Sequence, residues 1–186
     1  MNLKATARTL AAIAALVASP LMARAATTPV TPHPITVEFG FNWTTNSTTQ
    51  VLVKTVYDFQ IDYDLTGGTG KAPVSVYGGY GWANHAPIAG AKVTYNLWSL
   101  GVQTRTKHPV YAGMGFGYYG QSGTVSVAGV GSASTGQGGV GAQGFVGVDL
   151  FKPGRAGPGV KLGYNVLPSF QGLNTDSWFA ALTYRI

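Results

Sequence analysis

Hydrophobic and polar residues alternate with a period of two along most of the chain after residue 34. Residues 140–150 read Val-Gly-Ala-Gln-Gly-Phe-Val-Gly-Val-Asp-Leu, with a small or apolar residue at every even position. Successive side chains of a strand point to opposite faces, so this pattern predicts a strand with one apolar face. About eight such segments follow one another, each near the ten residues that a tilted strand needs to cross a bilayer. Strands of this kind span a membrane only in a closed barrel.

Two of the predicted strands have less regular patterns. The second one is predicted to begin near Val51, with Val51 and Val53 on the same apolar face as Tyr57. The fourth one, over residues 92–104, has apolar residues at odd positions up to Leu97 and at even positions from Trp98 onward. A change of face within one strand predicts either a β-bulge near Leu97 or a strand with bounds other than 92–104.

The connections between the strands differ in length. With both chain ends on the periplasmic side, the longest connection falls on the outer side, as in outer-membrane barrels. We expect outer loops at 44–50, 84–91, 120–138 and 167–176, and periplasmic turns at 66–73, 105–109 and 151–157. The predicted fold is therefore an all-β, eight-stranded antiparallel up-and-down transmembrane β-barrel.

Aromatic residues lie at the ends of the predicted apolar faces. Tryptophan and tyrosine favour the two membrane interfaces, since an apolar ring with a polar atom suits the headgroup region. An aromatic girdle is predicted with Trp43, Trp82, Tyr118 and Trp178 at the outer ends of their strands and Tyr63 and Tyr184 at the inner ends.

The first 25 residues have the features of a secretory signal peptide. Lys4 and Arg8 precede a short apolar stretch, and Ala23-Arg24-Ala25 has the small-x-small pattern of a cleavage site. We expect cleavage after Ala25, a periplasmic lead segment over residues 26–34 and the barrel over residues 35–186. The remaining chain has nine Lys and Arg residues against six Asp and Glu residues. These basic residues are dispersed, so no nucleic-acid partner is expected.

Cofactor, metal and catalytic motifs are sparse. The chain has no cysteine, which excludes disulfides and thiolate sites. Two G-x-G-x-x-G matches, beginning at Gly115 and Gly139, lie in or beside predicted strands and do not open a helix, so we expect no cofactor. The three histidines are placed before the barrel, in an outer loop and in an inner turn, so no metal site is expected.

The predicted barrel interior contains glycines, aromatic residues and charges. Gly113, Gly115 and Gly117 point inward and leave space for rings such as Tyr77 and Phe145. The inward charges are expected to form a buried network, since an unpaired buried charge is costly. Its members are Glu38, Lys54, Asp58, Asp62, Asp149, Lys161 and Arg185. A gate or a proton path is the alternative interpretation of these charges.

Residues 35–186 resemble the small eight-stranded outer-membrane barrels of Gram-negative bacteria, the OmpA-type and OmpW-type proteins. The final segment, Trp178-Phe-Ala-Ala-Leu-Thr-Tyr-Arg-Ile186, is similar to the C-terminal assembly signal of that class, although its last residue is Ile where Phe is usual. The resemblance implies a monomer in the cell outer membrane, with outer-membrane lipid and the barrel-assembly machinery as partners.

Three function hypotheses follow. The first is an outer-membrane barrel with a structural role, a surface-interaction role or a role in the passage of small hydrophobic solutes, and without enzymatic activity. The second is an outer-membrane lipid-modifying enzyme, which requires a Ser–His–acid set near the outer leaflet, with His85 at a suitable height. The third is a secreted soluble β-domain.

Overall fold

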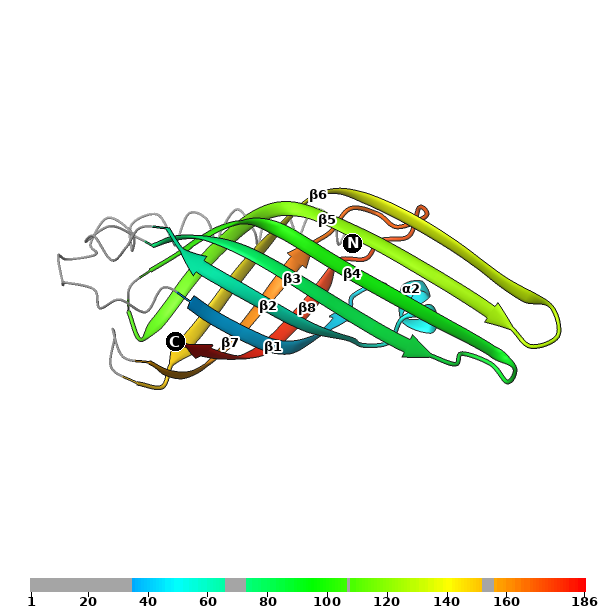
Figure 1. The fold of residues 1–186 in the computed structure, drawn as a ribbon, viewed down its shortest axis with the longest axis horizontal. Coiled ribbons are helices and arrows are strands. Elements are labelled where there is room, and N and C mark those ends of the chain that lie inside the picture. The colour runs from blue at the N-terminus through cyan, green and yellow to red at the C-terminus, as the bar shows by residue number, and fades with distance from the viewer. Residues whose placement is uncertain (1–34, 66–72, 107, 152–155) are drawn as a thin grey trace.

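The computed structural model describes residues 35–65, 73–106, 108–151 and 156–186. Eight antiparallel strands close into a barrel in sequence order (Figure 1), which confirms the predicted fold class. The strands are β1 (Ile35–Thr44), β2 (Val56–Asp64), β3 (Val74–His85), β4 (Ala91–Arg105), β5 (Val110–Val127), β6 (Gly131–Asp149), β7 (Gly157–Val166) and β8 (Ser177–Arg185), and a helix, α2 (Ser47–Leu52), lies between β1 and β2. The signal peptide, Ala25 and the lead segment lie outside the described residues and stay predictions.

The two ends of the barrel carry different connections and are called the outer end and the inner end. The outer end carries α2 and the connections at 86–90, 128–130 and 167–176, and the inner end carries Ile35 and Arg185. The β5–β6 hairpin projects beyond the other strands at the outer end, whereas β8 ends at the opposite side (Figure 1). None of the helices in the described ranges is long and apolar enough to cross a membrane.

The two faces of the strands differ as the alternation predicts. On β6, Val140 and Val146 are 78% and 56% exposed on the outside, whereas Gln143 and Phe145 are buried inside. Large apolar side chains are exposed in the same way around the barrel, among them Phe39, Leu100 and Leu182. Between its aromatic belts the barrel is therefore apolar outside and polar inside. That arrangement suits a lipid-facing wall and is the reverse of a soluble barrel.

The aromatic residues form belts on the outer surface. Toward the outer end, Trp43 lies opposite Trp178 in the β1–β8 register. Trp98 contacts Tyr118 with ring centroids 5.5 Å apart. Tyr63 and Tyr184 are about half exposed at the inner end. The structure thus adds Trp98 to the predicted girdle residues.

The start of the second strand is corrected by the structure. Residues 47–52 form α2, because the Asn46 side-chain oxygen caps its first turn by accepting hydrogen bonds from Thr48 N and Thr49 N. Val53 is buried instead of lipid-facing, and β2 begins only at Val56.

The predicted bulge in the fourth strand is also wrong. β4 pairs with β5 without interruption from Ala91↔Val127 to Arg105↔Gly113. Its odd residues point inward along the whole strand, and Val93, Tyr95 and Leu97 are all buried. The apolar residues change face because the barrel interior itself becomes apolar toward the outer end.

The predicted long loop at 120–138 is a hairpin instead. β5 and β6 stay paired from Gly120↔Gly138 to Val127↔Gly131, and only residues 128–130 form the turn. Gly129 has a φ of 77°, a left-handed conformation that favours glycine at this turn. This hairpin is rich in glycine and serine and lacks the apolar alternation that marks the other strands.

Interior glycines make room for large rings, as the sequence predicts. A Cβ atom on Gly117 would lie 2.6 Å from the Tyr77 hydroxyl oxygen, and one on Gly113 would overlap the Phe145 ring. Tyr77 and Phe145 are buried as a result.

Candidate functional site

The inward face of the barrel has two zones. In the middle and at the inner end it carries charges and amides, including Glu38, Gln143 and Lys161. Toward the outer end it carries Val93, Tyr95 and Leu97, each no more than 6% exposed. Between the outer aromatic belt and the outer end, the barrel thus has apolar side chains inside, as a soluble protein has.

The apolar zone encloses a cavity of about 280 Å³ at the outer end, called the outer cavity below. None of the described residues that line it is charged. Its apolar lining residues are Leu52, Val53, Val56, Val93, Tyr95, Leu97, Val125, Ala133, Leu167, Phe170 and Leu173.

The connection over residues 167–176 forms one wall of the outer cavity. Gln171 and Gly172, with φ of 50° and 77°, make a tight turn between Phe170 and Leu173, which form a β-bridge. This turn directs Phe170 against Tyr95, with ring centroids 5.9 Å apart. Asp176 stabilises the connection, because its carboxylate accepts hydrogen bonds from Leu167 N at 3.0 Å and from the connection's Asn174 side chain.

The α2 segment forms a second wall. Thr49 Oγ1 donates a hydrogen bond to Asn174 O at 2.8 Å, which joins α2 to the 167–176 connection. Gln50 Nε2 donates to Thr44 O at 2.7 Å, which joins α2 to the end of β1. These bonds hold Leu52 and Val53 at the rim and wall of the cavity.

Hydrogen-bonded polar side chains lie next to the outer cavity, and two of them, Asn42 and Tyr95, line it. The Tyr77 and Tyr119 hydroxyls lie 2.9 Å apart, and Asn165 Nδ2 donates to Asn42 Oδ1 at 2.9 Å. The Tyr95 hydroxyl donates to Gln121 Oε1. The first two contacts join strands that are two apart, β3 with β5 and β7 with β1, and the third joins the neighbouring strands β4 and β5.

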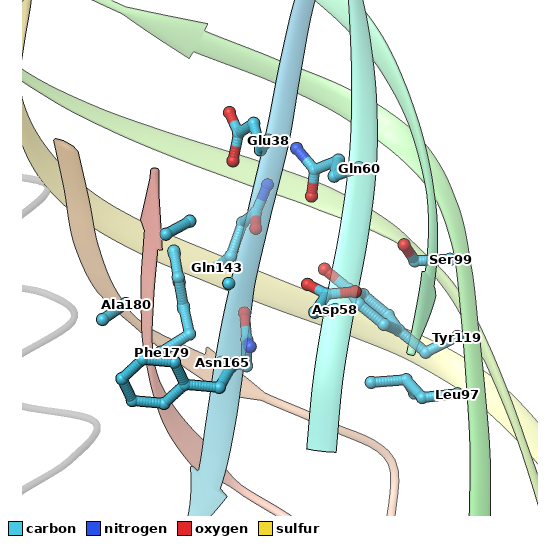
Figure 2. Close-up of a pocket in the computed structure, with 13 residues that line it drawn as sticks. Glu38, Asp58, Gln60, Leu97, Ser99, Tyr119, Gln143, Asn165, Phe179 and Ala180 are labelled. Carbon is cyan, nitrogen blue, oxygen red and sulfur yellow. The ribbon is translucent and has the colours of Figure 1, made fainter. Parts of the chain in front are cut away.

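A second, much smaller cavity lies in the polar interior (Figure 2). Its volume is about 20 Å³, which suffices for roughly one water molecule. Glu38, Asp58 and Gln60 come from β1 and β2, while Gln143 and Asn165 reach it from β6 and β7. The middle of the barrel is therefore nearly filled by side chains.

One ion pair dominates this polar interior. Lys161 Nζ donates hydrogen bonds to both Glu38 carboxylate oxygens, at 2.9 and 2.8 Å. The ammonium also lies 4.2 Å from the centroid of the Phe145 ring. Lys161 is 2% exposed.

Two further predicted charges, Asp58 and Asp62, lie near this pair. Asp62 is 5% exposed and accepts a hydrogen bond from Gln60 Nε2 at 2.6 Å. Asp58 lines the small cavity with Glu38. The structure thus brings Glu38, Asp58, Asp62 and Lys161 together in the middle of the barrel.

A second charge cluster lies at the inner end. The Asp149 carboxylate is 3.8 Å from Arg105 and 3.5 Å from Arg185. The Arg105 guanidinium also lies 4.6 Å from the centroid of the Tyr111 ring. Arg105 was predicted to lie in the turn at 105–109, but it is the last residue of β4 and continues its odd, inward face.

Lys54 is the one predicted network member that the structure places elsewhere. It is exposed in the connection between α2 and β2. The helical turn at 47–52 interrupts the alternation that had assigned Lys54 to the inward face. Arg105 takes its place among the inward basic residues.

Arg185→Ala is expected to lower the unfolding temperature of the barrel. The change leaves Asp149 with Arg105 as its remaining partner, so the effect should be smaller than for a fully buried pair. Thermal unfolding of the refolded protein measures it. An unchanged temperature would show that Arg185 adds no stability through Asp149.

The described residues offer little catalytic or metal-binding geometry. No group of three or more His, Asp or Glu side chains in these ranges is arranged to hold a metal ion. His85 ends β3 at the outer end, and none of the ion pairs among the described residues includes it. The structure therefore adds no support to the lipid-enzyme hypothesis.

Solved structures of outer-membrane barrels resemble this chain, whereas no family model and no curated protein matches its sequence. The N-terminal β-barrel domain of Pseudomonas aeruginosa OprF aligns with a TM-score of 0.53 and 14% identity, over 83% of this chain and 98% of that domain. Ail, the attachment invasion locus protein of Yersinia pestis, aligns with a TM-score of 0.56 and 9% identity, over 83% of this chain and 99% of Ail.

Neisserial surface protein A aligns with a TM-score of 0.55 and 14% identity, over 82% of this chain and 94% of that protein. These likenesses confirm the predicted resemblance at the level of the fold: the chain has the fold of the eight-stranded outer-membrane barrels. At such low identities they carry no information on ligands or partners.

Proposed function

We propose that this chain is an outer-membrane β-barrel protein that takes up a small, uncharged, hydrophobic molecule into the outer cavity. The observation that carries the proposal is an apolar cavity of about 280 Å³ without a charged lining residue, above the aromatic belt. The outer cavity favours a hydrophobic ligand, because binding there removes apolar surface of the ligand from water.

The volume of the cavity limits the size of the ligand. An engineered protein cavity of about 150 Å³ binds benzene. In proportion, the outer cavity has room for on the order of ten carbon atoms. Ligands of this class include small aromatic compounds and medium-length alkyl compounds.

Binding at the outer end is favoured over passage along the barrel axis. The hydrogen bonds Tyr77–Tyr119 and Asn165–Asn42 join strands that are two apart, and Tyr119 and Asn165 also line the small polar cavity. The Glu38–Lys161 pair lies in the polar interior beyond them. A solute moving along the axis would have to break these contacts and to pass buried charges.

Recognition of a polyanion is less consistent with this outer surface. Ail has been solved in complex with the heparin analogue sucrose octasulfate. In the present chain, residues 120–138 of the projecting hairpin contain no charged residue. Sulfate groups would find few basic partners there.

The proposed location can be tested by gel mobility. Membrane fractions from cells that make the full chain are applied with and without boiling. A folded barrel in detergent is expected to migrate differently from its boiled form and to be found with the outer membrane. A chain in the soluble fraction, without a mobility shift, would contradict the proposed location.

The proposed ligand site can be tested with naphthalene, a neutral fluorescent probe of ten carbons. The barrel is refolded into nanodiscs, and bound naphthalene is measured by equilibrium dialysis against empty nanodiscs. We expect about one bound molecule per barrel. Val93→Trp places a large ring in the outer cavity and is expected to weaken binding about tenfold or more.

Leu100→Trp is the matched control, because Leu100 lies on the same strand and is 64% exposed on the outer surface. It should leave naphthalene binding unchanged. Binding no greater than that of empty nanodiscs, or binding that Val93→Trp does not weaken in a folded barrel, would overturn the proposal.

A further inference from the structure

Two polar atoms beside the outer cavity have no hydrogen-bond partner. They are Thr44 Oγ1 and Asn42 Nδ2, and in the described ranges they are the only buried side-chain nitrogen or oxygen atoms in this state. Both residues line the outer cavity, from successive inward positions of β1. Thr44 is 5% and Asn42 2% exposed.

Such atoms are unusual in folded proteins, in which the large majority of buried polar atoms are paired. The other polar groups of the two residues do have partners. Thr44 O accepts a hydrogen bond from Gln50 Nε2, and Asn42 Oδ1 accepts one from Asn165 Nδ2. These bonds fix the Thr44 backbone and the Asn42 side chain, while one donor group on each residue has no partner.

Of the two atoms, Thr44 Oγ1 is the stronger evidence for a ligand contact. The Asn42 amide lies beside the Asp58 carboxylate, so its nitrogen is less available to a ligand than the Thr44 hydroxyl. The Thr44 hydroxyl, in contrast, lies at the outer end of β1, where the cavity is lined by Val53 and Val56. A hydroxyl both donates and accepts, and an amide nitrogen only donates.

We infer that the ligand of the outer cavity is a neutral hydrocarbon that carries one oxygen acceptor, as in a ketone, an aldehyde or an ester. This inference rests on the proposed function. The ligand oxygen accepts a hydrogen bond from the Thr44 hydroxyl, with Asn42 Nδ2 as a second donor nearby. The hydrocarbon part packs among Leu97, Val93 and Phe170.

A free carboxylate fits this site less well than a neutral oxygen. No Lys, Arg or His lines the outer cavity, so the charge would be removed from water without an opposite charge beside it. A pure hydrocarbon would leave the Thr44 hydroxyl without a partner. A neutral acceptor matches both the apolar lining and the single free hydroxyl.

A matched pair of ligands tests the inference. 2-Nonanone and 2-methyl-1-nonene have the same shape, but only the ketone has an oxygen acceptor. Each is added to the naphthalene-loaded barrel in nanodiscs, and displacement is corrected for partition into empty nanodiscs. The ketone is expected to displace naphthalene at about tenfold lower free concentration than the alkene, as one buried hydrogen bond implies.

Three variants, at positions 44 and 94, test whether the preference for the ketone depends on the Thr44 hydroxyl. Thr44→Val removes the hydroxyl at nearly constant shape and should reduce the preference for the ketone to about twofold or less, without weakening alkene binding. Thr44→Ser keeps a hydroxyl and should retain the preference. Thr94→Val changes a threonine on the outer surface of β4, which does not line the cavity, and should have no effect. Folding of each variant is checked by gel mobility, and Thr44→Ala replaces Thr44→Val if the valine variant does not fold.

The outcomes separate this inference from the proposed function. Equal displacement by ketone and alkene, or a ketone preference that persists in Thr44→Val, overturns the inference while the outer cavity remains a hydrophobic site. Failure of naphthalene itself to bind overturns the proposed function.

Discussion

Lys161→Met is expected to destabilise the barrel by about 3–5 kcal/mol, because it leaves the Glu38 carboxylate buried without its partner. Lys161 Nζ is 2.8 Å from Glu38 Oε2, and the two side chains are 2% and 7% exposed. Asp62 is also buried in the same polar interior, at 5% exposed. The free energy of unfolding is measured by urea titration of the barrel refolded in lipid vesicles.

Two control variants define this result. Lys54→Met removes an exposed lysine and should change the free energy of unfolding by about 0.5 kcal/mol or less. The double variant Glu38→Gln with Lys161→Met removes both charges and should recover part of the loss. A loss below about 1 kcal/mol for Lys161→Met would mean that water or another cation reaches Glu38.

Val146→Arg is expected to destabilise the barrel by about 2–4 kcal/mol, the cost of an arginine on the lipid face near the middle of a membrane. Val146 is 56% exposed on the outside of β6, between Ala112 of β5 and Leu162 of β7. In a soluble barrel the same change would place a charge in water and have little effect. The same urea titration in vesicles measures the change.

Val130→Arg is the matched control for Val146→Arg. Val130 lies in the β5–β6 turn, 84% exposed, beyond the aromatic belt. Its replacement should leave the free energy of unfolding nearly unchanged. Equal effects at the two positions would contradict a lipid-facing wall at Val146.

The faces of the strands could be predicted from the sequence because alternation is a local property. On β6, the inward Gln143 and Phe145 and the outward Val146 follow directly from their parity. The hairpin at 120–138 could not be predicted in this way. It lacks the apolar alternation, so its extent depends on the pairing between β5 and β6, which no single segment contains.

The outer cavity was missed for a related reason. A change of face was predicted within the fourth strand, because every apolar residue, including Val93, Tyr95 and Leu97, was assumed to face lipid. Only the uninterrupted register of β4 with β5 shows that these residues point inward. The change of parity at Leu97 was the sequence signal for this apolar interior. For α2, the signal was Asn46 before Ser47, because asparagine is a common helix N-cap.

We predict that lipid ends at the outer aromatic belt and that the apolar part of the barrel interior lies between this belt and the outer end. The chain has no cysteine, so single-cysteine variants can be labelled at one site. Leu100 and Thr94 lie on the same outward face of β4, on either side of Trp98. A fluorophore is attached to each variant, and its quenching by nitroxide-bearing lipids is measured in vesicles. We predict strong quenching at Leu100→Cys and little at Thr94→Cys. Equal quenching at the two positions would contradict a lipid boundary at the outer aromatic belt.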